Sequence, residues 1–178
     1  SAPNVIGTVN VLKGSFGTRN PESVVEYRGN VYWLDVNNGR VIQYSANGLF
    51  PISNYKMTRF WKNWCEQFLS MTTAQIEVLG GRPFVFSAVD PFHDELLYSL
   101  PKLIEVPPKG YLANYTVIPA TPDLQEYIVY PFDILDYQDK TIVYDLISNS
   151  WRGSYSFYSE GFATLQNQLY SSKTGQLY

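Results

Sequence analysis

Short runs that alternate apolar and polar residues, separated by turn residues, make up most of this chain. Such alternation, with a period of two, is typical of strands that bury one face. Within its first third the pattern predicts four strands, at residues 23–28, 31–35, 40–45 and 49–53. Asn-Asn-Gly at 37–39 predicts a type I′ turn between the second and third strands, because Asn and Gly tolerate positive φ.

A stretch near residues 55–71 breaks this alternation. Apolar residues recur there at helical spacing and predict an amphipathic helix over 57–71 that Ser53 or Asn54 could cap. Its apolar face holds Met57, Phe60, Trp61, Trp64, Phe68 and Leu69. Packing of this face against a sheet is the simpler interpretation, while docking to a partner chain is the alternative. Too few cationic residues lie on this helix to favour a membrane surface.

Strand patterns resume after the helix and continue to the last residue. They predict strands at 75–79, 84–89, 95–100, 111–118, 127–130, 141–146, 151–157, 162–165, 168–171 and from 176 onward. Five prolines at 101–123 indicate a long connection. One unit recurs imperfectly along the chain: two strands joined by a polar turn, with an aromatic residue near the turn. Such repeats are typical of propeller blades. We therefore expect one all-β domain over 1–178, built of propeller-like antiparallel meander sheets in about three to four blade-like units, with one inserted helix.

The composition limits the classes of partner. Aromatic residues make up 16% of the 178 residues, and the net charge of −3 disfavours a nucleic-acid groove, which needs a basic face. Cys65 is the single cysteine, so no internal disulfide can form, which fits a reducing compartment or a particle assembled in cytoplasm. No segment is long and apolar enough to span a bilayer.

The acidic segments offer two candidate metal sites, and neither has the pattern that a metal loop requires. His93 is the single histidine and lies beside Asp90, Asp94 and Glu95, a set that could hold a divalent ion or act in acid–base chemistry. These residue types are also ordinary at a hairpin turn. Asp133, Asp136 and Asp139 follow one another at three-residue spacing, which is not that of an EF-hand loop. We therefore assign no metal and no cofactor.

Catalytic signatures are also missing from the sequence. No G-x-S-x-G, G-x-G-x-x-G or P-loop motif occurs, and Cys65 falls on the apolar face of the expected helix. A propeller glycosidase would need two facing carboxylates, and Asp35, Asp133 and Asp145 cannot be paired from sequence. We therefore expect a protein that is not an enzyme.

Aromatic residues are the remaining candidates for binding. They could contact a partner protein or stack on sugar rings, or they could pack between blades. The candidates are Trp33, Trp61, Trp64, Trp151 and Tyr155.

Two resemblances bear on function. Tyr144 and Trp151 match the Tyr/Trp spacing of kelch-type blades, although the Gly-Gly that precedes the Tyr in that family is missing. Residues 17–57, which begin GTRNPESVVEYRGNVYWLDVNNG, and residues 161–178, GFATLQNQLYSSKTGQLY, resemble segments of large virion proteins of tailed phages, especially the crAss-like phages of Bacteroidetes.

The phage resemblance implies a propeller-like domain within a tail, ring or muzzle protein of the virion. It implies a non-enzymatic structural role in the tail or portal-vertex assembly, with other virion proteins or copies of the same chain as partners. Because the chain stops within the last expected hairpin, we expect a fragment of a longer polypeptide, whose residues 4–12 could pair with 176–178. A carbohydrate-binding propeller for host glycans, or a glycosidase fragment, is the alternative.

Overall fold

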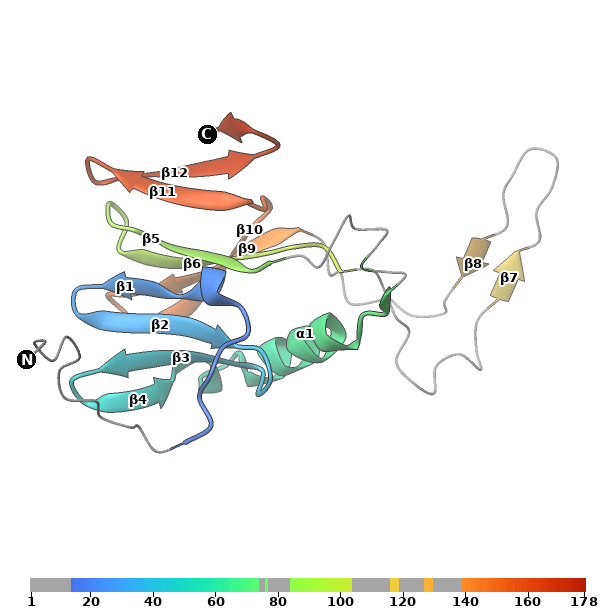
Figure 1. Cartoon of the computed structure of the whole chain (residues 1–178), viewed down its shortest axis with the longest axis horizontal. Helices are drawn as coiled ribbons and strands as arrows, with labels where there is room; N and C mark the ends of the chain where they lie inside the picture. The colour runs from blue at the N-terminus through green and yellow to red at the C-terminus, as the bar shows by residue number, and fades with distance from the viewer. Residues whose placement is uncertain (1–13, 74–75, 77–83, 104–115, 119–126, 130–138) are drawn as a thin grey trace, which may run out of the picture.

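A computed structural model describes residues 14–73, 76, 84–103, 116–118, 127–129 and 139–178 of the chain. The described part is mostly β: three antiparallel sheets stand beside one another, and a single long helix lies along two of them (Figure 1). The expectation of a mostly β chain built of antiparallel meanders with one helix is therefore confirmed.

The first sheet is a four-stranded meander in the order β1-β2-β3-β4. Its strands are β1 (Val25–Tyr27), β2 (Asn30–Asp35), β3 (Arg40–Ser45) and β4 (Gly48–Pro51). The outer two strands are shorter than expected. A 3-10 turn at Pro21–Ser23 precedes β1, and another at Ile52–Asn54 follows Pro51, which has no N–H to donate to a ladder.

The second sheet is also a meander, with a long connection inserted between its two hairpins. Its order is β10-β9-β6-β5. Its strands are β5 (Phe86–Asp90), β6 (Glu95–Leu100), β9 (Lys140–Asp145) and β10 (Ser150–Tyr155). The central strand β6 is buried along its whole length, whereas β10 forms an exposed edge.

The third sheet has three strands in the order β11-β12-β13, and a separate pair, β7 with β8, lies in the long connection. The bounds are β7 (Thr116–Ile118), β8 (Tyr127–Val129), β11 (Gly161–Leu165), β12 (Gln168–Lys173) and β13 (Gln176–Leu177). Residues 75, 77–79, 111–115 and 130 of the expected strands lie outside the described part, and Ile76 is helical, with its N–H bonded to the Thr72 carbonyl.

Helix α1 (Thr58–Ser70) buries most of its apolar face on the first two sheets, whereas Leu69 of the expected face is exposed. Trp61 and Trp64 are fully buried, and Trp61 contacts Tyr98 of β6 and Trp151 of β10 edge to face or tilted, at centroid distances of 5.6 and 5.5 Å. The helix therefore uses its aromatic stripe for the core, which is the first of the two alternatives that its pattern allowed.

The start of α1 differs from the expected cap. Met57 is the N-cap, without a side-chain hydrogen bond, and Lys56 before it has φ of 63°. Ser53 is engaged elsewhere, because its hydroxyl accepts the N–H of Val41 at 3.1 Å. Neither Ser53 nor Asn54 caps the helix, since the 3-10 turn and the left-handed residue separate them from its first turn.

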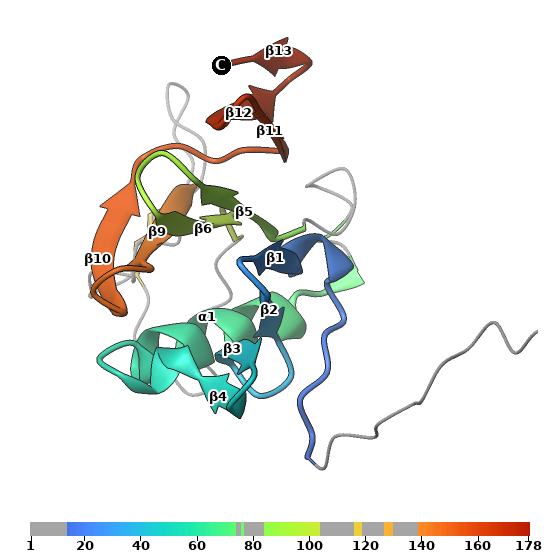
Figure 2. The same ribbon diagram turned by 90° about the vertical axis from the view of Figure 1, so that its left-hand side faces the viewer.

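The first strands of the three sheets lie side by side. β1 contacts β5, and β5 contacts β11, so the three sheets are neighbours in the order in which they occur along the chain (Figures 1 and 2). The sheets of the described part do not close into a barrel or a ring.

Buried hydroxyl groups join the third sheet to the second. The N–H of Ser159 donates to the Ser99 hydroxyl at 2.6 Å. The Thr141 hydroxyl donates to the Phe157 carbonyl at 2.8 Å and lies 3.3 Å from the Ser99 hydroxyl. These hydroxyl-bearing residues have at most 1% of their surface exposed. Because buried polar groups need partners, these hydrogen bonds fix the position of the segment that leads into β11.

Candidate functional site

Three hairpins of the two larger sheets have turns of the same construction. In each, the last residue of the first strand is an aspartate whose carboxylate accepts one or two backbone N–H groups of the following turn. Four residues later the backbone enters the left-handed region, with φ between 51° and 61°. The aspartates are Asp35, Asp90 and Asp145, and the left-handed residues are Gly39, Asp94 and Asn149.

The turn after Asp35 is not of type I′, so that prediction is wrong. Only Gly39 of its residues has positive φ, and the N–H of Gly39 bonds to the Val36 carbonyl, so the connection is a four-residue turn that ends in a left-handed Gly. The Asp35 carboxylate accepts the backbone N–H and the side-chain amide of Asn38, at 3.3 and 2.7 Å. This aspartate favours the longer turn because it satisfies N–H groups that a type I′ turn would not present to it.

The other two Asp-capped turns lie next to each other at one end of the molecule (Figure 1). The Asp94 carbonyl accepts the N–H of Leu146 at 2.9 Å, which joins the β5–β6 turn to the β9–β10 turn. Arg28, in the β1–β2 turn, pairs with the Asp94 carboxylate at 3.0 Å. We call this end the hairpin-tip surface, formed by the turns at 28–29, 91–94, 146–149 and 166–167.

Large apolar side chains project from the hairpin-tip surface into solvent. Phe92 is 73% exposed and Ile147 is 72% exposed, the two largest values among the large hydrophobic residues of the described part. Leu165, at the end of β11, is 63% exposed. Tips of hairpins ordinarily carry polar or small residues, so these side chains need an explanation that the fold itself does not supply.

A compact charged cluster lies at the strand ends next to these turns. Glu95 and Asp145 face each other across β6 and β9, both are buried, and the guanidinium of Arg152 contacts both carboxylates. Tyr155 donates its hydroxyl to Glu95 at 3.0 Å. Hydrogen bonds from the N–H of Ser148, then of Ile147, and the charge of Arg152 lower the pKa of Asp145. Asp145 thus holds the turn as an ionised carboxylate.

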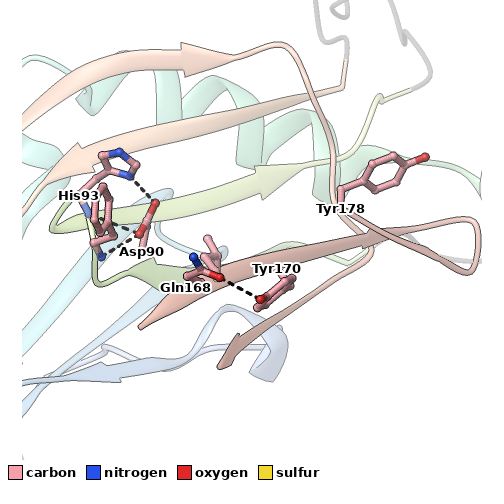
Figure 3. Close-up of a pocket in the computed structure, with 7 residues that line it drawn as sticks. Asp90, His93, Gln168, Tyr170 and Tyr178 are labelled. Carbon is pink, nitrogen blue, oxygen red and sulfur yellow. Dashed lines mark hydrogen bonds and ion pairs between the residues drawn. The ribbon is translucent and has the colours of Figure 1, made fainter. Parts of the chain in front are cut away.

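His93 and Asp90 form an ion pair on the same surface. The Nδ1 atom of His93 lies 2.7 Å from Asp90 Oδ2, and this hydrogen bond raises the pKa of His93 above its ordinary value of 6.5. Both residues line a shallow hollow of about 320 Å³ between the β5–β6 turn and the third sheet. Figure 3 shows Asp90 and His93 on one side of it and Gln168, Tyr170 and Tyr178 on the other.

The aromatic residues expected to contact partners are distributed differently. Trp61 and Trp64 belong to the core, and Trp33 is half-buried with its Nε1 atom buried and without a hydrogen-bond partner in the described part. Trp151 is half-buried, contacts the Tyr144 ring and donates its Nε1–H to the Ile52 carbonyl at 3.2 Å. The matching kelch-like pair therefore packs together, and Tyr155, 43% exposed, is the candidate that lies on the surface.

The other candidates for chemistry have structural surroundings. Cys65 is buried in the core, and burial raises the pKa of its thiol, which disfavours the reactive thiolate. Asp139 accepts the N–H of Lys102 at 2.7 Å and pairs with Lys173, while Asp133 and Asp136 lie outside the described residues. Where the structure describes the chain, no three or more His, Cys, Asp or Glu residues are grouped to hold a metal ion.

Sequence reasoning did not single out Phe92 or Ile147. It considered Asp35, Asp90 and Asp145 as candidate carboxylates for chemistry, without recognising their common role in capping turns. A signal for them exists in the sequence, because Asp35, Asp90 and Asp145 are equally spaced along the chain and each ends an apolar strand pattern. The second residue after Asp90 and Asp145 is a large apolar residue, which is unusual for a turn.

No described helix has the length and apolar character needed to cross a membrane. Comparisons with protein-family models, with curated proteins and with solved structures found no match to this chain.

Proposed function

We propose that this chain is a non-enzymatic structural domain of a phage virion protein, and that it contacts neighbouring subunits in the tail or portal-vertex assembly through the hairpin-tip surface. The observation that carries the proposal is the exposure of Phe92 and Ile147 on two adjacent, tightly bonded turns. The resemblance of residues 17–57 and 161–178 to virion proteins of tailed phages supports the proposal that the particle is a tailed phage.

The energetics of such a surface favour association. Burial of a Phe or Ile side chain against a partner gains about 1.5–3 kcal/mol relative to leaving it in water. Hydrogen bonds donated by backbone N–H groups to the capping aspartates already order both turns, so little conformational entropy is lost when a partner binds. Charged residues such as Arg28 and Arg152 surround the apolar tips, as the polar rim of a protein interface does.

The arrangement of the sheets supports a propeller-like architecture. Three meanders follow one another in sequence, and their first strands, β1, β5 and β11, lie side by side. In propellers the first strands of successive blades meet around the axis in this way. We propose that the three sheets are blade-like units, which would place their hairpin tips on one face for contact with a neighbouring subunit.

Hydroxyl-radical footprinting of the isolated domain and of virus particles from its source tests the assembly role. Oxidation of Phe92 and Ile147, read by mass spectrometry, should be rapid in the isolated domain and strongly reduced in particles. Trp61 is buried and provides the control, because it should be protected in both samples. Equal oxidation of Phe92 and Ile147 in domain and particle would contradict a contact through the hairpin-tip surface.

A further inference from the structure

The hollow beside the hairpin tips combines aromatic rings with one carboxylate. Phe92 lines it, and so do Tyr170 and Tyr178, which lie on the side of the third sheet (Figure 3). Tyr178 is 67% exposed, so its ring is accessible to a ligand. Aromatic faces carry negative potential, and rings beside a carboxylate attract a cation more strongly than either group does alone.

The charges around the hollow leave the Asp90 carboxylate without a permanent cation. Arg28 pairs with Asp94, and Arg152 pairs with Glu95 and Asp145. Among the described residues, the charged partner of Asp90 is His93, 61% exposed at its side chain, which loses its charge above its pKa. The surface around the hollow therefore has more carboxylates than guanidinium groups.

We propose that this hollow binds the guanidinium group of an arginine side chain from the neighbouring virion subunit. The inference rests on the proposed assembly function and names the chemistry of the partner at that surface. A planar guanidinium can stack on the ring of Tyr178 or Phe92, and its positive charge is attracted by the Asp90 carboxylate. The ammonium of a lysine would make the ionic contact without the flat stacking geometry.

A sugar ring is the competing occupant, and the polar groups of the hollow fit it less well. Asp90 Oδ1 already accepts the N–H groups of Phe92 and His93, at 2.9 and 3.4 Å, and Oδ2 is bonded to His93. Tyr170 donates its hydroxyl to Gln168 Oε1 at 3.0 Å. The hydrogen bonds that remain are few for any ligand, and a cation gains in addition from the charge of the Asp90 carboxylate, which a neutral sugar ring does not.

An NMR titration of the whole chain, labelled with nitrogen-15, can test this inference at about pH 8, where His93 carries less charge than at neutral pH. The probes are N-acetyl-arginine amide, its neutral analogue N-acetyl-citrulline amide, and the methyl β-glucoside and β-galactoside. We expect the arginine probe to shift signals of His93, the Gln168 side-chain amide and Tyr170, with a dissociation constant on the order of 1–10 mM. Citrulline should bind at least about fivefold more weakly, because the charge is absent.

Two variants and one control make the result specific. Asp90→Asn keeps an acceptor for the turn N–H groups and removes the charge, and Tyr178→Ala removes one ring at an exposed position. Each should weaken arginine binding by about fivefold. Tyr55→Ala, which removes a ring 59% exposed outside the hollow, should leave it unchanged.

The possible outcomes separate this inference from the assembly role. Equal binding of citrulline, binding of a glycoside in place of arginine, or no shift at these residues would each overturn the cation site. If the arginine probe fails while Phe92 and Ile147 are protected in particles, the cation site is wrong and the assembly role stands.

Discussion

Phe92 and Ile147 occupy the same position in two turns of the same construction. Each is the second residue after a capping aspartate, and the aspartate accepts its N–H, at 2.9 Å for Phe92 and 2.7 Å for Ile147. In the third such turn, this position holds Asn37, and that turn packs against helix α1. The apolar residue thus appears in the two turns that reach solvent at the hairpin-tip surface, which favours a role outside the fold.

If Phe92 serves a partner, its loss should cost the isolated domain almost nothing. We expect Phe92→Ala to change the free energy of unfolding by less than about 0.5 kcal/mol. Phe68→Ala is the matched control, since Phe68 is 5% exposed and stacks on Trp64, and it should lose about 3–5 kcal/mol. Urea unfolding measures both. A Phe92 variant as unstable as the Phe68 variant would assign Phe92 to the core.

Two glycines with similar backbone angles should respond very differently to a methyl group. Gly39 has φ of 61°, and a Cβ there would lie 2.7 Å from the Cα of Lys62 in α1. Gly29 has φ of 77° with open space around it. We expect Gly29→Ala to cost about 1 kcal/mol from backbone strain alone, and Gly39→Ala to cost about 3 kcal/mol or more, because the helix must also move. Equal losses would mean that the β2–β3 turn does not press on α1.

The pKa of His93 reports directly on its bond to Asp90. As the single histidine of the chain, it gives one imidazole titration by NMR. The hydrogen bond to Asp90 raises this pKa above 6.5, and we expect Asp90→Asn to return it toward that value. The contribution of the pair to stability is complete below pH 6.5 and is lost as the pH rises through the folded-state pKa. A titration that Asp90→Asn leaves unchanged would contradict the pair.

Asp145 should make the fold sensitive to acid. Its pKa in the folded chain lies below the value of 3.8 expected when unfolded, mainly because the Ser148 N–H donates to it. The stability that it contributes is therefore present above that value and is lost as the pH falls through the folded-state pKa. Between about pH 5 and pH 2, the unfolding free energy should fall less steeply in Asp145→Asn than in the wild type. Urea unfolding across this range measures the slopes, and identical slopes would rule out an ionised Asp145.

Much of the fold could be predicted because local patterns and tertiary packing agree. β3 and β6 have the bounds that alternation predicts, and α1 lies within one residue at each end of the predicted 57–71. Where the local pattern and the tertiary contacts disagree, the contacts determine the structure. Ser53 bonds to β3 instead of capping α1, and the Asp35 carboxylate stabilises a longer turn than Asn and Gly alone would favour.

The candidate site was much harder to predict from the sequence. The sequence predicts Trp61 and Trp64 as candidate binding residues because they are aromatic, but both are buried in the core. Phe92 is conspicuous only once the structure shows that its side chain lies 73% exposed at the tip of a turn. His93 and Tyr178 are far apart in the chain, and the docking of the third sheet on the second brings them to one hollow. Such pairings depend on how the sheets are placed, which alternation does not encode.

The proposed virion role can be tested by immunodetection, with an antibody to this domain, of density-gradient fractions from a lysate of its source. We expect the antigen to sediment with intact particles and to stay with them after a high-salt wash. Antigen found in cell fractions and absent from washed particles would contradict the virion role.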